Sequence, residues 1–226
     1  MKINYPDNEE FFSLPFYVDK RVLIPRNDTE VLVEQVIKSL KGAQNKDISF
    51  IDIGTGSSAI VTAVTKNTPV SLKQIFAVDI SLDALEVAKI NIEKNNIQDK
   101  VSLYNSDLLE IFLSGNKKIE AKNLIITANL PYIKNGDIEN MDQEVLDKEP
   151  HIALFGGEKT GFEMYERLIG EIDELKKIYH FESIQVFIEI GFDQYEYSHE
   201  YLSQKGLKFE YFKDLNTIYR VIKITW

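Results

Sequence analysis

The chain has 226 residues, of which 44% are hydrophobic and 27% are charged. This length and composition are typical of a soluble globular protein with one full core. The sequence contains no cysteine, which excludes disulfides, thiolate nucleophiles and cysteine-ligated zinc. The net charge is −10 and no basic run is present, so the composition disfavours a broad nucleic-acid-binding surface.

No apolar stretch approaches the roughly 20 residues of a membrane-spanning helix. Residues 1–10 are polar and acidic and lack the apolar core of a signal peptide. The three histidines, His151, His180 and His199, are far apart and do not have the spacing of metal ligands. We therefore expect a cytoplasmic protein with no membrane span and no metal site.

Residues 1–45 are predicted to form an N-terminal extension made of a hairpin and a helix. Two short apolar runs, Phe16–Val18 and Val22–Ile24, are separated by charged residues, which suggests a small hairpin. After them, Asp28 or Thr29 can cap a helix whose apolar side chains recur at helical spacing.

Residues 46–226 alternate between apolar runs and helical patterns. Strands are predicted over Ile48–Ile53, Gln74–Asp79, Val101–Tyr104, Leu124–Ala128 and Ser183–Ile190, and helices over Ser57–Lys66, Leu82–Asn95, Gly161–Ile178 and Asp193–Ser203. The last two runs, Leu207–Phe212 and Thr217–Ile224, can pair as an antiparallel hairpin. Continuous apolar strands alternating with helices indicate a parallel sheet covered on both faces. We predict an α/β, Rossmann-like domain with a mostly parallel seven-stranded sheet.

The stretch of residues 133–160 shows little periodicity and follows directly on a predicted strand. Loops of this length in a compact domain are usually functional or disordered. Glu149-Pro150 within it is by default a turn. We expect this segment to line the entrance of a substrate site.

The first predicted strand leads into a glycine-containing loop and a helix, formed by Gly54, Thr55, Gly56, Ser57 and Ser58. Glycine lets the backbone turn tightly and approach a ligand closely. The free N–H groups of the helix that follows favour a carboxylate or another polar ligand. A lone Gly-x-Gly is a weak signal, and Ser58 stands where a dinucleotide fingerprint has its third glycine.

Acidic residues end the next two predicted strands. Asp79 can accept hydrogen bonds from both ribose hydroxyls, and Asp107 can accept one from an adenine amine. Either residue alone could instead be a helix cap or a turn residue. Because the carboxyl ends of parallel strands meet at one edge, the two together predict a nucleotide-like cofactor site.

The fourth predicted strand ends in Asn129-Leu130-Pro131-Tyr132. A turn that contains proline is common, but this one faces the predicted crevice. An amide nitrogen is a poor nucleophile, and oriented acceptors can turn its lone pair toward a methyl group. Asn129 offers a carbonyl and an NH2, the Leu130 carbonyl is a second acceptor, and the Tyr132 ring can wall the target group. The motif indicates methyl transfer to an amide or amino nitrogen.

The order of several blocks resembles that of the release factor glutamine methyltransferases, from about Phe11 to near the C-terminus. No single block is specific, but the combination in this order is. The matching blocks are Leu14–Phe16 with Val22–Glu30 (family L-I-P-R-P-x-T-E), Asp52–Ile60 (D-L-G-T-G-S-G-A-I), Asn129–Tyr132 (N-P-P-Y), Glu149-Pro150 with Ala153–Gly157 (E-P and A-L-x-G-G), Glu189–Gly191, and Asp214-Leu215 with Arg220-Val221.

The resemblance implies a class I methyltransferase fold and the cofactor S-adenosylmethionine. It implies cofactor contacts from Gly54, Thr55, Gly56, Ser57, Ser58, Asp79, Asp107, Leu108 and Asn129. It also implies that Asn129, Pro131 and Tyr132 are catalytic and, with Leu130, hold a glutamine side chain. In this family that glutamine lies in the Gly-Gly-Gln tip of peptide-chain release factors. Release factors are therefore the expected partners, and nucleic acid is not the expected substrate.

This sequence departs from the family pattern at three positions. Ser58 replaces the third glycine of the loop, Leu130 replaces the first proline of N-P-P-Y, and Asn27 replaces the proline after I-P-R. The family also commonly carries an N-terminal helical domain, most of which has no counterpart in the residues before Leu14.

Two other functions stay open at this point. N-L-P-Y also resembles the motif of rRNA adenine dimethylases, so an adenine or cytosine amino-methyltransferase acting on DNA or rRNA is the first alternative. The absence of a basic run and of a target-recognition domain gives it less support. The second alternative is a module that keeps the fold but has no catalytic activity. The departures from the family pattern at Ser58 and Leu130 suggest it.

Overall fold

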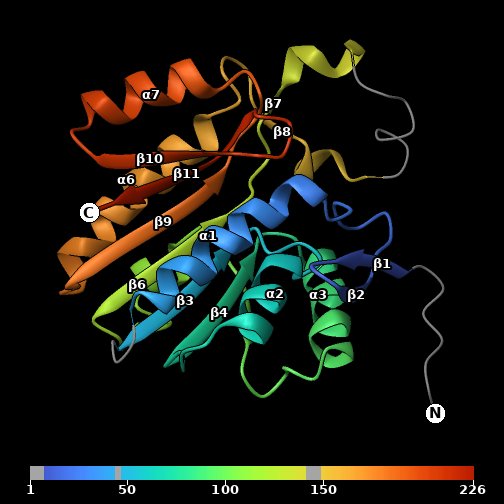
Figure 1. Ribbon diagram of the computed structural model, residues 1–226, viewed down its shortest axis with the longest axis vertical. Coiled ribbons are helices and arrows are strands. Elements are labelled where there is room, and N and C mark those ends of the chain that lie inside the picture. The colour runs from blue at the N-terminus through green and yellow to red at the C-terminus, as the bar shows by residue number, and fades with distance from the viewer. Residues whose placement is uncertain (1–7, 44–46, 141–148) are drawn as a thin grey trace.

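The computed structural model describes residues 8–43, 47–140 and 149–226. A seven-stranded sheet runs through it in the order β10-β11-β9-β6-β3-β4-β5 (Figure 1). The strands are β3 (Ile48–Ile53), β4 (Gln74–Asp79), β5 (Ser102–Asn105), β6 (Asn123–Ala128), β9 (Ser183–Glu189), β10 (Lys208–Lys213) and β11 (Tyr219–Thr225). The helices are α1 (Glu30–Lys41), α2 (Ala59–Asn67), α3 (Leu82–Lys94), α4 (Glu110–Leu113), α6 (Glu163–Ile178) and α7 (Tyr195–Gln204).

The pairing within the sheet confirms the predicted α/β fold. The five strands β5, β4, β3, β6 and β9 pair in parallel, and β11 inserts antiparallel between β9 and β10. The parallel strands therefore present their carboxyl ends at one edge of the sheet. The C-terminal hairpin was correctly predicted, although sequence spacing alone could not place its second strand inside the sheet.

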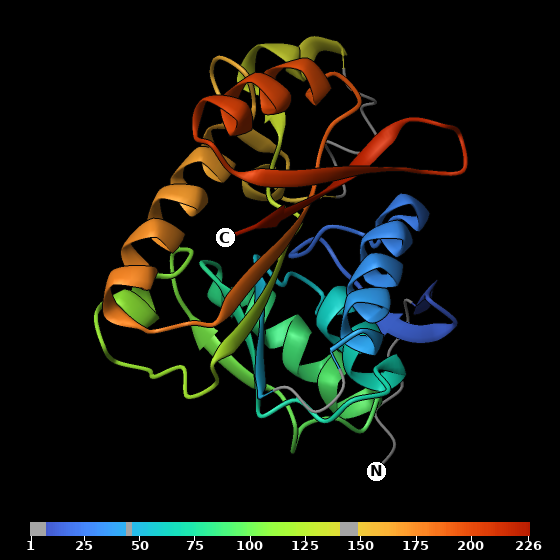
Figure 2. The ribbon, with the colours of Figure 1, turned by 60° about the vertical axis from the view of Figure 1, so that its left-hand side comes forward.

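Helices cover both faces of the sheet because successive strand side chains point to opposite sides. Phe50 and Ala77 belong to the hydrophobic cluster that includes α1 and α2. Ile51 and Val78, one residue further along each strand, belong to the cluster that includes α6. Figure 2 shows α1 and α6 on opposite sides of the strands.

The predicted N-terminal hairpin is wrong in its residues. The hairpin is formed by β1 (Asn8–Phe11) and β2 (Leu14–Tyr17), joined by Phe12 and Ser13, which both have positive φ. The run Val22–Ile24 is not a strand, because Val22 instead packs against α3 after a turn. This apolar run therefore packs on a helix and does not pair with a strand. The proposed boundary at residue 45 remains a prediction.

The stretch of residues 133–160 contains more structure than its sequence pattern predicts. It holds β7 (Ile133–Lys134), a 3-10 helix over Asn135–Asn140, another over His151–Ala153, and β8 (Phe155–Gly157). Strands β7 and β8 pair in parallel and form a small separate sheet. Residues 141–148, which belong to the predicted entrance loop, lie outside the described residues.

Other predicted boundaries shift by only a few residues. Helix α6 begins at Glu163 rather than at Gly161, because Gly161 has a φ of 71° and the Glu163 carboxylate accepts from the Lys159 and Thr160 N–H groups. In the part of the chain that the structure describes, no helix is both long and apolar enough to cross a membrane.

Candidate functional site

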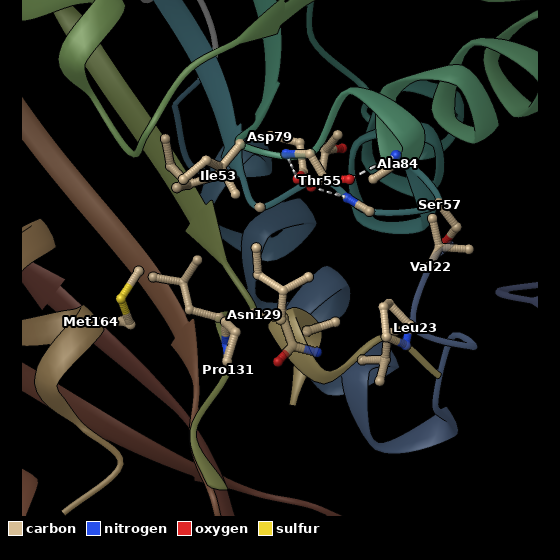
Figure 3. A pocket seen from close by; sticks show the side chains of 18 of the residues that line it. Val22, Leu23, Ile53, Thr55, Ser57, Asp79, Ala84, Asn129, Pro131 and Met164 are labelled. Carbon is tan, nitrogen blue, oxygen red and sulfur yellow. Dashed lines mark hydrogen bonds between the residues drawn. The ribbon is translucent and has the colours of Figure 1, made fainter. Parts of the chain in front are cut away.

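A cavity of about 350 Å³ opens at the carboxyl ends of β3, β4, β5 and β6. Figure 3 shows Thr55 and Asp79 on one side of it and Asn129 and Pro131 on the other. The predicted cofactor and acceptor residues in its lining are Gly54, Thr55, Gly56, Ser57, Asp79, Asp107, Leu108, Asn129, Leu130 and Pro131. Ser58 and Tyr132 are not part of this lining.

The loop after β3 depends on left-handed backbone at three positions. The φ angles of Gly54, Gly56 and Ser58 are 65°, 52° and 64°. A Cβ at Gly54 would lie 2.9 Å from Leu130 Cδ2, so the loop and the Asn-Leu-Pro-Tyr motif pack directly together. Ser58 thus has a left-handed backbone conformation, which costs less free energy for glycine than for a residue with a side chain. The Ser58 side chain is fully buried. The presence of serine instead of glycine here therefore affects the backbone beneath the cavity and not the cavity wall.

Buried Asp52 ties this loop to β6. Its carboxylate accepts from the Thr55 hydroxyl at 2.7 Å and from the Thr127 hydroxyl at 2.6 Å. Burial raises the pKa of Asp52 to about 6, while the two threonine hydrogen bonds oppose the rise. The carboxylate thus fixes the loop geometry at a cost in desolvation.

The raised pKa of Asp52 predicts that stability falls as pH rises. The unfolded chain releases this proton near its ordinary pKa of 3.8, and the folded chain near 6, so the fold binds more protons in between. The loss should reach roughly 2–3 kcal/mol at most. Urea unfolding of the cofactor-free protein from pH 4 to pH 7 measures it, and Asp52→Asn should reduce the slope. An equal slope in both proteins would contradict this origin.

Asp79 links the end of β4 to the glycine loop. It accepts from the Gly56 N–H at 2.8 Å and from the Ser81 N–H at 2.9 Å, and burial raises its pKa. The helix cap of α3 is Ser81, whose hydroxyl accepts from the Ala84 N–H at 3.2 Å. Asp79 is therefore not the cap of that helix, and its carboxylate lines the cavity.

Asp107 has a partner that sequence reasoning missed. It forms an ion pair of 2.7 Å with Arg167 of α6, which also lines the cavity. No motif marks Arg167, which is one charged residue among several on an amphipathic helix. Leu108 follows with a φ of 44° and is buried. Asp107 lines the cavity, but its negative charge is partly neutralised by the Arg167 guanidinium.

The Asn-Leu-Pro-Tyr motif is held from behind by Tyr165 of α6. The Leu130 N–H donates to the Tyr165 hydroxyl at 3.0 Å. That hydroxyl lies 3.3 Å from the Leu130 carbonyl and also donates to the Glu189 carbonyl. The N–H that leucine has and proline lacks is therefore satisfied, and the departure from N-P-P-Y leaves no orphaned buried donor.

A second, smaller cavity of about 140 Å³ adjoins the first. Its lining includes Tyr132 and Glu189, and it shares Asn129 and Leu130 with the larger cavity. Burial raises the pKa of Tyr132 well above its usual range, so the hydroxyl stays neutral. Asn129 and Leu130, together with Leu23, Arg26 and Ala153, line both cavities, so the motif lies where the two spaces adjoin.

Arg26 connects the N-terminal segment to the far side of these cavities. It pairs with buried Glu149 at 2.6 Å, and the Ile24 N–H lies 3.3 Å from the same oxygen. Arg26 lines both cavities. Arg220 of β11 in turn pairs with Asp28 and Asp214, at 3.3 and 3.1 Å. Both arginines therefore join distant segments around the site.

The larger cavity fits S-adenosylmethionine by its chemistry. The Asp79 carboxylate can accept ribose hydroxyls, because each oxygen that accepts a backbone N–H keeps a further lone pair. The glycines leave the loop without side chains where a ligand would approach. Val22, Leu23, Ile60 and Ala84 supply apolar walls for the rest of the cofactor.

Comparison with known proteins relates the chain to methyltransferases. The family model for ribosomal protein L11 methyltransferase (PrmA) matches residues 31–131. The chain is 40% identical over 159 residues to the release factor glutamine methyltransferase of Clostridium acetobutylicum, covering 70% of this chain and 53% of that protein. It is 34% identical over 228 residues to the same enzyme of Mycoplasma mycoides subsp. mycoides SC, covering 97% and 76%.

Solved structures show the same fold at low sequence identity. The hMettl16 catalytic domain in complex with MAT2A 3'UTR hairpin 6 is 17% identical, with a TM-score of 0.63 and coverage of 94% of this chain and 76% of that one. The chain spans about half the length of the Clostridium relative, whereas it covers 76% of the Mycoplasma protein at 34% identity. The chain therefore belongs to the release factor glutamine methyltransferase family.

Proposed function

We propose that this chain transfers a methyl group from S-adenosylmethionine to the N5 nitrogen of a protein glutamine, in the Gly-Gly-Gln segment of peptide-chain release factors. The observation that carries the proposal is the shared lining of the two adjoining cavities, to which Asn129 and Leu130 of the motif contribute. The larger cavity suits the cofactor, and the smaller one suits a flat amide. The names of the relatives support the choice of glutamine.

The residues of the motif would bind and orient the amide. Asn129 Oδ1 accepts one N–H of the glutamine NH2 and the Leu130 carbonyl accepts the other, which turns the nitrogen lone pair toward the cofactor. The Tyr132 ring walls the amide plane. When bound, S-adenosylmethionine supplies an electrophilic methyl group on a positively charged sulfur. The methylated nitrogen then sheds its proton to water, so no general base is needed.

Mass spectrometry of a recombinant release factor, incubated with this protein and S-adenosylmethionine, tests the proposal. We expect a gain of one methyl group on the glutamine of the Gly-Gly-Gln peptide. A release factor in which glutamate replaces that glutamine is the matched control and should gain none. Calorimetric titration with S-adenosylhomocysteine establishes separately that the cofactor site works.

Two outcomes would overturn the proposal. Cofactor binding without transfer to the release factor, together with methylation of DNA or rRNA that weakens steeply with salt, would favour a nucleic-acid substrate. The net charge of −10 makes this the less expected result. Failure to bind the cofactor at all would favour a silent member of the fold.

A further inference from the structure

Glu189 has a buried carboxyl group that lies beside the side-chain amide of Asn129 in the Asn-Leu-Pro-Tyr motif. It ends β9, which pairs in parallel with β6 so that Ala128 faces Ile188, and Asn129 and Glu189 follow as neighbours. Only 2% of Glu189 is exposed, and it lines the smaller cavity. Its Oε2 atom has no hydrogen-bond partner within the described residues. A buried carboxyl group without a full set of partners is costly to keep, which points to a use.

Within the residues that the structure describes, no ion pair involves Glu189. Arg220 acts on it electrostatically, but Arg220 is already paired with Asp28 and Asp214. Asp28 and the hydroxyls of Tyr132 and Tyr165 also face the group. Burial raises the pKa of Glu189 to about 7, and interactions with Thr29, Arg220 and Asn129 oppose the rise. The carboxyl group is therefore poised between its two charge states near neutral pH.

Thr29 connects this carboxyl group to the motif. The Asn129 Nδ2 atom donates to the Thr29 hydroxyl at 3.3 Å. Thr29 occupies the N-cap position of α1, but its side chain does not cap that helix, so the hydroxyl is not used by the helix end. A hydroxyl has one proton to donate, and an ionised carboxylate can only accept. The side chains of Thr29 and Asn129 are both hydrogen-bond partners that lower the pKa of Glu189. The relay therefore has one direction, from Asn129 Nδ2 and the Thr29 hydroxyl toward the Glu189 carboxyl group.

The direction of this relay decides which end of the Asn129 amide faces the acceptor. With Nδ2 engaged by Thr29, Oδ1 is left to accept from a substrate NH2. A reversed amide would turn Oδ1 toward Thr29 and the carboxylate, and Nδ2 toward another NH2 group, where two donors would meet. Reversal would therefore remove the hydrogen bond on which the proposed orientation of the nitrogen depends.

We propose that Glu189 is a positioning residue that acts through Thr29 to hold the Asn129 amide with its oxygen toward the methyl-accepting nitrogen. The identity of that nitrogen rests on the proposed function, but the orientation of the amide does not. In this role Glu189 acts on the geometry of Asn129, although its side chain also lines the smaller cavity.

Steady-state kinetics of Glu189→Gln test the effect on turnover. Glutamine has nearly the same shape but carries an NH2, so it no longer fixes the direction of the relay. We expect kcat to fall about 10- to 100-fold, with KM for the release factor and the Kd for S-adenosylhomocysteine within about threefold. Thr29→Val should lower kcat similarly, and Thr29→Ser should restore most of that loss. Exposed Glu182, near the opposite end of β9, supplies the matched control Glu182→Gln.

The pH profile separates positioning from packing. The carboxylate form is the required acceptor, so kcat of the wild-type protein should rise with pH through a midpoint near 7. In Glu189→Gln this rise should be absent. A merely structural side chain would lower activity without removing that step.

Nuclear magnetic resonance of the Asn129 side-chain NH2 tests the orientation without any substrate. Its signal, identified by its loss in Asn129→Ala, should titrate with Glu189 near pH 7 and lose this titration in Glu189→Gln. If the wild-type protein does not methylate a release factor, this measurement still tests whether Glu189 orients the Asn129 amide. Wild-type kcat in Glu189→Gln, or an Asn129 signal that is indifferent to Glu189, would overturn it.

Discussion

Asn129→Ala should lower kcat about 100- to 1,000-fold while the Kd for S-adenosylhomocysteine changes by no more than about threefold. The truncation removes the Oδ1 atom that would accept from the glutamine NH2. It leaves in place the glycine loop, Asp79 and the Asp107–Arg167 pair, which also line the cavity. Single-turnover methylation and calorimetric titration measure the two effects separately.

The control for this prediction is Asn116→Ala, since Asn116 is exposed and lies outside both cavities. It should leave both quantities unchanged. Near-normal turnover of Asn129→Ala would remove Asn129 from the proposed mechanism. An equal loss of cofactor affinity would instead assign Asn129 to cofactor binding.

The strands and the larger cavity could be predicted because they depend on local signals. Most of the parallel strands are apolar runs. Asp79 is the last residue of β4, Asp107 lies two residues after β5, and Asn129 follows β6 directly. Parallel strands bring such residues to one edge whatever the details of packing. Most of the predicted site residues line the larger cavity, Ser58 and Tyr132 do not, and the functional roles of all of them remain proposals.

The features that sequence reasoning missed depend on long-range packing. Arg167 reaches Asp107 from a helix that begins far downstream, and the Thr29 hydroxyl meets Asn129 across 100 residues. The N-terminal hairpin was misplaced for a related reason. The run around Val22 is apolar because it packs on α3, and a short apolar run does not reveal whether its partner is a strand or a helix.

The two departures that favoured a silent module have local explanations in the structure. Ser58 takes the left-handed conformation with a φ of 64°, below the cavity and out of its lining. The extra N–H of Leu130 donates to Tyr165, and the Leu130 side chain fills the space next to Gly54. Neither substitution blocks the cavity or leaves a buried donor unpaired, so both are compatible with an active site.

Gly156→Ala should disrupt the motif from the side opposite Tyr165. A Cβ at Gly156 would lie 2.0 Å from the Pro131 carbonyl oxygen and 2.7 Å from the Gly161 carbonyl oxygen. Both are backbone atoms, so no side chain can rotate away, and β8 or the Asn-Leu-Pro-Tyr segment must move. We expect a loss of at least 2 to 3 kcal/mol in the free energy of unfolding, on the order of other overpacked sites.

Methyl transfer should fall more than cofactor affinity in Gly156→Ala, because the displaced segment carries the proposed amide-binding groups and Tyr132 lines the smaller cavity. A shift of about 1 Å there can cost about 100-fold in rate. Gly170→Ala is the matched control: a Cβ at this position in α6 meets nothing within 4 Å, and alanine should stabilise the helix by roughly 0.5–1 kcal/mol. Urea unfolding and single-turnover methylation measure both variants. Because Gly156 lies against the Pro131 backbone, a Gly156→Ala protein with wild-type stability and turnover would show that this contact does not position the acceptor site.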